Sequence, residues 1–97
     1  MDSMWSVDLA YPSTEEWWSQ GNDLVNEVIK AAGDDAEWES SGTGFGFRDI
    51  QIRVQTRAIG RRFVREVKER FKKAGIPLEY CYVYKEADDE YHEEDEA

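Results

Sequence analysis

The sequence is poor in the residues on which disulfide, metal and membrane chemistry depend. It holds one cysteine, Cys81, and one histidine, His92, among 97 residues. A lone cysteine cannot close an internal disulfide, so nothing in the sequence demands an oxidising compartment. No apolar run approaches the roughly 20 residues of a membrane span, and the first residues lack the basic start and apolar stretch of a secretory signal. These absences predict a soluble, cytoplasmic protein that does not enter membranes.

The same scarcity argues against catalysis. His92 lies among acidic residues close to the C-terminus, where a fixed catalytic or metal-binding geometry is not expected. Without a histidine in the folded body, Cys81 cannot form a cysteine–histidine nucleophile. We interpret it as a small core residue. The C-terminal carboxylates lack the spacing of an EF-hand loop. We therefore expect no enzyme activity, no metal site and no cofactor.

Charge divides the chain into three blocks of different sign. Residues 1–46 carry ten acids and one base, residues 47–85 carry eleven bases and four acids, and residues 86–97 carry eight acids and no base. The last block has too few apolar residues to offset the entropy of ordering it. We therefore expect a single domain over residues 1–85, nearly neutral as a whole, followed by a disordered acidic tail at 86–97.

Apolar periodicity predicts four strands and two helices in the body, with strands alternating every second residue and helices repeating every three to four. In order, the predicted elements are a strand at 5–10, a helix at 14–32 capped by Ser13, strands at 36–40 and 45–55 joined by a turn at 41–44, a second helix capped by Thr56 and ended by Gly75 and Pro77, and a strand at 78–84. Trp5, Val7 and Leu9 share one face of the first strand, which we assign to the core. The last strand offers three tyrosines on one face and Cys81 and Val83 on the other, and the alternation leaves open which face is core.

The order strand, helix, strand, strand, helix, strand resembles the ferredoxin-like superfold across about residues 4–85. Right-handed crossovers would place the four strands in one antiparallel sheet with both helices on one face, an α+β architecture. This superfold hosts many unrelated functions, so the resemblance implies no activity. No specific family is identified from it.

A second resemblance covers only four residues. The run Gly44-Phe45-Gly46-Phe47 is similar to the glycine–aromatic signature on the third strand of the RNA-recognition motif, a family with the same element order. That resemblance implies single-stranded RNA binding, with Phe45 and Phe47 stacking bases on the open sheet. Thr43, Arg48 and Ile50 depart from the family's pattern, and the first strand offers no stacking aromatic on that face.

The favoured interpretation is a non-catalytic protein-binding module. The sequence predicts an exposed aromatic patch formed by Phe45 and Phe47, together with the three tyrosines if Cys81 and Val83 face the helices. An exposed aromatic patch of this kind favours binding to a partner. The acidic N-terminal half suits a partner with a basic surface. The expected partner-binding residues are Phe45, Phe47, Tyr80, Tyr82, Tyr84, Asp34, Asp35, Glu37 and Glu39.

Two further expectations concern the role of such a module. In character it resembles small acidic inhibitors, such as bacterial immunity proteins and phage anti-defence proteins, that block a basic, nucleic-acid-binding surface. The same aromatic patch would also serve a homodimer formed through the open sheet face. RNA binding is the alternative to both.

Overall fold

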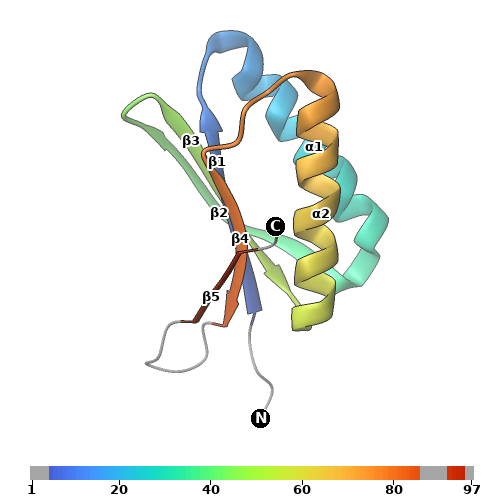
Figure 1. Ribbon diagram of the computed structural model, residues 1–97. Helices are drawn as coiled ribbons and strands as arrows, with labels where there is room; N and C mark the ends of the chain where they lie inside the picture. The colour runs from blue at the N-terminus through green and yellow to red at the C-terminus, as the bar shows by residue number, and fades with distance from the viewer. Residues whose placement is uncertain (1–4, 86–91, 96–97) are drawn as a thin grey trace.

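Two helices pack on one face of a five-stranded antiparallel sheet in the computed structural model of the protein, which describes residues 5–85 and 92–95 (Figure 1). The elements are β1 (Trp5–Pro12), α1 (Glu15–Ala32), a 3₁₀ helix η1 (Gly33–Asp35), β2 (Ala36–Gly44), β3 (Phe47–Val54), α2 (Arg57–Ala74), β4 (Tyr80–Lys85) and β5 (His92–Asp95). The strands lie in the order β2-β3-β1-β4-β5. The first four strands and both helices form the predicted ferredoxin-like α+β fold.

Each α-helix is capped at its N-terminus by a threonine whose hydroxyl accepts a backbone hydrogen bond. Thr14 Oγ1 accepts from the Trp17 amide at 3.1 Å, and Thr56 caps α2 in the same way, as predicted. The prediction of Ser13 as the cap of α1 is wrong by one residue. The Ser13 amide instead donates to the carbonyl of Gly46 at 2.9 Å, which ties the start of α1 to the turn between β2 and β3.

The turn between β2 and β3 consists of Phe45 and Gly46, whose φ angles are 55° and 84°. Two successive positive φ values are typical of a two-residue type I′ turn. The predicted turn at 41–44 is therefore wrong, because those residues continue β2 as far as Gly44, which lies opposite Phe47. Glycine takes the second positive φ without strain, which moves the reversal to the Phe45-Gly46 step.

Alternate strand residues form the core together with the inner faces of the helices. Val7 and Leu9 from β1, Ile52 from β3 and Val83 from β4 are completely buried. The helices contribute Val25, Val28, Phe63, Val64, Val67 and Phe71. Burying each side chain of this size contributes roughly 1.5–3 kcal/mol before entropy is counted. The predicted core face of the first strand is confirmed, and Cys81 and Val83 prove to face the helices.

Helix α2 approaches the sheet most closely at Gly60. A Cβ atom at this position would lie 2.5 Å from Cγ2 of Val83 and 3.2 Å from Cγ2 of Val54. Real Cβ atoms essentially never approach another atom to 2.5 Å, so a larger residue would require Val83 or the helix to move. The missing side chain at Gly60 thus allows the close packing of α2 on the sheet.

Strand β5 extends the sheet at the β4 edge, where its four residues pair antiparallel with Tyr82–Lys85. This differs from the prediction of a disordered tail for residues 92–95. Backbone hydrogen bonds to an edge strand do not require apolar side chains, so composition alone did not reveal the pairing. The rest of the predicted tail, residues 86–91 and 96–97, lies outside the described residues, as do residues 1–4.

Candidate functional site: the open sheet face

The face of the sheet opposite the helices, here called the open face, displays the strand residues that alternate with the core (Figure 1). The strand registers assign to it Ser6, Asp8 and Ala10 from β1, Glu37 and Ser40 from β2, Phe47, Asp49, Gln51 and Arg53 from β3, and Tyr80, Tyr82 and Tyr84 from β4. The set combines aromatic rings with carboxylates, a composition suited to contact with another macromolecule.

The three tyrosines of β4 form a ladder along this face. The ring centroids of Tyr80 and Tyr82 are 5.6 Å apart, and those of Tyr82 and Tyr84 are 5.9 Å apart. These separations lie in the range of favourable aromatic pairs. Tyr80 is 40% exposed, whereas Tyr84 is buried. The ladder therefore presents its exposed end at the start of β4 and is anchored at its other end.

A polar chain anchors Tyr84. The Ser40 hydroxyl donates to Oε1 of Gln51 at 3.1 Å, and Nε2 of Gln51 donates to the Tyr84 hydroxyl at 2.7 Å. These bonds connect β2, β3 and β4, and the second spans β1, which lies between β3 and β4. The chain of hydrogen bonds therefore holds side chains of three strands in one arrangement on the open face.

Negative charge prevails on the open face. Asp49 is exposed and Asp8 is half-buried, and they lie on the neighbouring strands β3 and β1. Arg53 is the one base among the open-face residues named above. It is held by two carboxylates, with Nη1 at 3.6 Å from Glu37 and Nη2 at 2.7 Å from Glu39. Its charge is therefore offset within the protein, and the exposed carboxylate of Asp49 adds negative charge to the face.

The acids expected to form one surface are divided between two places. Asp34 and Asp35 are exposed in η1, between α1 and β2. Glu37 and Glu39 lie on β2 and pair with Arg53. Of these four acids, only Glu37 and Glu39 adjoin the open face.

The two phenylalanines are also divided. Phe47 lies on the open face opposite Pro12 and is 37% exposed. Phe45 lies in the hairpin turn and is fully exposed. The prediction that Phe45 and Phe47 stand together on the sheet is wrong for Phe45, because the turn falls at that residue. With β1 between β3 and β4, Phe47 does not adjoin the tyrosine ladder as a neighbour in the sheet.

A buried arginine on the helix side of the sheet was not anticipated. Arg48 is 7% exposed, and its Nε and Nη2 donate to Oδ1 of Asn22 at 3.1 Å and 2.8 Å. Its guanidinium carbon lies 4.4 Å from the ring centroid of Trp18 and 5.9 Å from that of Trp38. Cation–π contacts and an amide oxygen thus compensate this charge, since no salt bridge to Arg48 occurs within the described part of the chain.

The arginine cluster joins the hairpin to α1. Thr43 accepts hydrogen bonds from Nε1 of Trp18 at 2.9 Å and from Nη1 of Arg48 at 3.4 Å. The Tyr11 hydroxyl donates to the carbonyl of Trp18 at 2.9 Å. These bonds join β1, β2 and β3 to α1, so we interpret the cluster as a structural tie behind the open face.

Burial raises the pKa of Tyr11 above its ordinary value of 10.0, an effect that the nearby positive charge of Arg48 partly opposes. Because the folded state holds this proton more tightly, its contribution to stability is complete below pH 10 and is lost as the pH rises through the folded pKa. Replacing Tyr11 with phenylalanine should lower the free energy of unfolding by about 1 kcal/mol at pH 8, through loss of the hydrogen bond. This difference should narrow above pH 10, and a constant difference in urea unfolding up to pH 11.5 would contradict the assignment.

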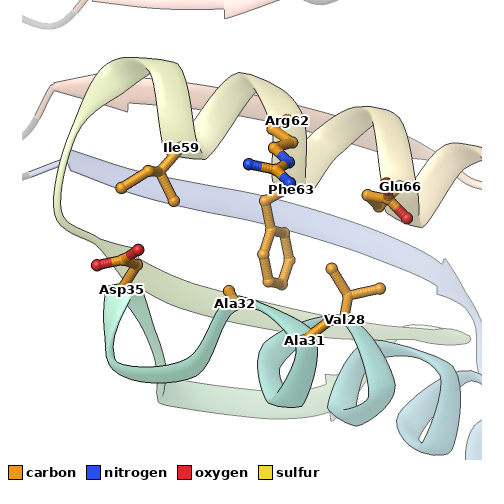
Figure 2. Close-up of a pocket in the computed structure, with 8 residues that line it drawn as sticks. All are labelled: Val28, Ala31, Ala32, Asp35, Ile59, Arg62, Phe63 and Glu66. Carbon is orange, nitrogen blue, oxygen red and sulfur yellow. The ribbon is translucent and has the colours of Figure 1, made fainter.

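A small hollow lies between α1 and α2 on the far side of the molecule. Figure 2 shows Phe63 pointing from α2 towards Ala31 and Val28 of α1, with Asp35 and Ile59 at one end. Its volume is about 200 Å³. Pockets that enclose small-molecule ligands usually measure roughly 300–1,000 Å³, so we assign no ligand to it.

Among residues 5–85 and 92–95, no group of three or more histidine, cysteine, aspartate or glutamate residues is arranged to hold a metal ion. Cys81 is buried. Neither helix of the described chain has the length and apolar character that crossing a bilayer requires.

No protein-family model matches the chain, and no curated protein matches it in sequence. A solved structure with the same fold is that of a de novo designed protein, Foldit4. It superposes with a TM-score of 0.63 over 90% of this chain and 99% of the designed chain, at 14% sequence identity. This likeness concerns the fold alone.

Proposed function

We propose that the protein is a non-catalytic binding module whose open face docks a protein partner with a basic surface. The observation that supports the proposal most is the composition of that face. The tyrosine ladder of β4 lies beside Asp8 of β1, and Asp49 lies one strand further away on β3. The charge of Arg53 is offset by its own ion pairs. Exposed aromatic rings supply contact area at protein interfaces, and carboxylates attract a basic partner.

Single-stranded RNA binding is the second candidate, because Phe47 and Tyr80 are exposed aromatic residues on which bases could stack. The charges on the same face oppose it. Asp8 and Asp49 would repel a phosphate backbone, and basic side chains supply much of the affinity of proteins for nucleic acid. A protein partner is therefore the better fit.

The finer proposal is that the module acts as a small cytoplasmic inhibitor that covers a basic, nucleic-acid-binding surface, as immunity and anti-defence proteins do. Its support is the sign of the charge on the open face. Self-association through that face is less favourable, because a twofold contact would bring two faces with the same negative charge together.

Asp49→Lys should weaken binding to the partner, whereas Glu69→Lys should not. Both substitutions change the net charge equally, but Glu69 lies on α2, on the opposite side of the sheet. Because Asp49 attracts the basic surface, its reversal should slow association roughly tenfold at low salt and reduce the salt dependence. Proteins retained by each immobilised variant from an extract of the source cells, at two salt concentrations, provide the measurement.

Equal loss with both variants would indicate a non-specific effect of net charge and would contradict docking on the open face. Labelled single-stranded RNA provides the opposing test. If the protein binds RNA, Asp49→Lys should strengthen binding by removing repulsion, and tight, salt-sensitive binding by the wild type would overturn the proposal.

A further inference from the structure

The first residue of the turn between β2 and β3 departs from two ordinary preferences of folded proteins. Phe45 is an aromatic residue with a fully exposed side chain, and its φ angle of 55° lies in the left-handed region. Bulky residues rarely adopt this conformation, and the first position of a type I′ turn is normally asparagine, aspartate or glycine. Neither the core nor the turn therefore explains a phenylalanine here, and such departures are concentrated at functional sites.

The backbone around this residue is held in place. The Ser13 amide donates to the carbonyl of Gly46, and Thr43 accepts hydrogen bonds from Trp18 and Arg48. These bonds join residues on both sides of Phe45 to α1 or to the segment directly before it. Figure 1 shows the tip of the β2–β3 hairpin projecting at the margin of the molecule. The ring of Phe45 is therefore exposed on a hairpin whose position is fixed.

Carboxylates lie close to the hairpin tip on two elements. Glu15 and Glu16 are exposed in the first turn of α1, and Asp49 is exposed on β3. Lys30, the only base among residues 1–46, lies in the last turn of α1. A surface that complements the tip would therefore offer an apolar site for the ring and basic side chains around it.

The tip is also continuous with the open face. Phe47 follows the turn directly, lies on that face opposite Pro12 and is 37% exposed. A partner docked on the open face would therefore extend to Phe45 without a second, separate interface.

We propose that Phe45 is an anchor residue, whose ring enters an apolar pocket of the protein partner, and that basic side chains border this pocket. The proposal rests on the proposed function and names the residue that would hold the partner at one end of the open face. Aromatic side chains that fill a pocket of the other protein carry a large share of the binding energy at interfaces. A role in binding also explains why the turn lacks the residue that would make it most stable.

The test compares the wild type with Phe45→Asn and Phe45→Leu. Asparagine followed by Gly46 is the pair most typical of this turn, whereas leucine keeps an apolar side chain. Gln55→Ala is the control, because Gln55 is exposed at the opposite end of β3. The probe is the basic protein that the immobilised wild type retains from an extract of the source cells at low salt, purified before use. Calorimetric titration measures its affinity, and urea unfolding measures the stability of each variant.

Phe45→Asn should change stability and binding in opposite directions. The midpoint of urea unfolding should rise, because asparagine adopts the left-handed conformation with less strain. Affinity for the probe should fall roughly thirtyfold or more, as at an interface hot spot. Phe45→Leu should weaken binding less than Phe45→Asn does, and Gln55→Ala should change neither quantity. A residue that served the fold alone would not separate the two measurements.

Fluorine NMR tests the insertion of the ring itself. 4-Fluorophenylalanine replaces Phe45 in one protein and Gln55 in a control protein, and a soluble paramagnetic reagent broadens the fluorine signal of any exposed label. When the probe is bound, the label at position 45 should be protected from this broadening, whereas the label at position 55 should remain accessible. An accessible label at position 45 in the complex would overturn the proposal.

Three further results would overturn it. The first is equal probe affinity for the wild type and Phe45→Asn, and the second is a lower unfolding midpoint for Phe45→Asn, which would show that the fold itself uses the ring. The third is a different occupant. A wild-type dimer that dissociates with Phe45→Asn would identify a second copy, and single-stranded RNA binding that is lost with Phe45→Asn would identify stacked bases.

These outcomes are separate from those that test the proposed function. A probe whose binding is weakened by Asp49→Lys but unaffected by Phe45→Asn would support docking on the open face and overturn the anchor. A probe insensitive to both substitutions, or a wild type that retains no basic protein, would overturn both proposals.

Discussion

Replacing Phe71 with alanine should lower the free energy of unfolding by about 3–5 kcal/mol. Phe71 is almost fully buried between α2 and the sheet, and its ring meets that of Tyr11 edge-on with centroids 5.2 Å apart. The substitution removes this contact and leaves a cavity that the surrounding strands can fill only in part. Urea unfolding followed by circular dichroism measures the loss.

The matched control for Phe71 is Phe45→Ala. Phe45 is fully exposed in the hairpin turn, so its replacement should change the free energy of unfolding by less than about 0.5 kcal/mol. Similar losses for the two variants would contradict the placement of the core. The control also tests function, because an RNA-binding protein of the kind that the Gly44–Phe47 run resembles would lose affinity with Phe45→Ala.

Arg48→Ala should cost roughly 2–4 kcal/mol, although Arg48 forms no ion pair within the described residues. The loss arises from the contacts with Trp18 and Trp38 and from Oδ1 of Asn22, which loses the two donors of Arg48. Arg65 provides the control, because it is an exposed residue of α2 with the same charge. Arg65→Ala should change stability by less than about 0.5 kcal/mol.

Arg48→Met separates packing from charge. Methionine fills most of the space of the arginine stem and has no charge to compensate, so it should recover part of the stability that alanine loses. Equal losses with alanine and methionine would show that the hydrogen bonds and the charge, rather than the packing between the tryptophans, carry the effect. A loss below 1 kcal/mol for Arg48→Ala would contradict the interpretation of the cluster as a structural tie.

Periodicity was sufficient to predict the main elements of the fold. The alternation of Val7 and Leu9, and the helical spacing around Phe63 and Val67, each reflect burial on one side, and burial determines where these elements pack. The element order then leaves few topologies, of which the ferredoxin-like one is found.

The hairpin turn was harder to place because two stretches compete for it. Residues 41–44 hold two glycines and read as a turn, but they extend β2, while Phe45-Gly46 reverses the chain. Pairing with all of β3 gains more hydrogen bonds than an early turn would allow. Cross-strand pairing therefore outweighs the preference of residues 41–44 for a turn. The chain reverses at Phe45, and this residue does not lie on the sheet.

The buried position of Arg48 could have been predicted from the same alternation that located Phe47. Arg48 shares the parity of Ile50 and Ile52, so the period of two places it on the core side. Its compensation by Trp18, Trp38 and Asn22 could not be foreseen, because these residues are brought together only when α1 and the hairpin pack. The pairing of β5 with β4 could not be predicted either, because main-chain hydrogen bonds require no particular pattern of side chains.

Site-specific photo-crosslinking tests docking on the open face most directly. A benzophenone amino acid replaces Tyr80, the exposed end of the tyrosine ladder, or Arg65 on the outer face of α2, and each variant is irradiated in an extract of the source cells. The account predicts that a basic protein is crosslinked from position 80 and not from position 65, and that Asp49→Lys strongly reduces the yield of this product. Crosslinks formed chiefly from position 65, or to RNA from position 80, would contradict it.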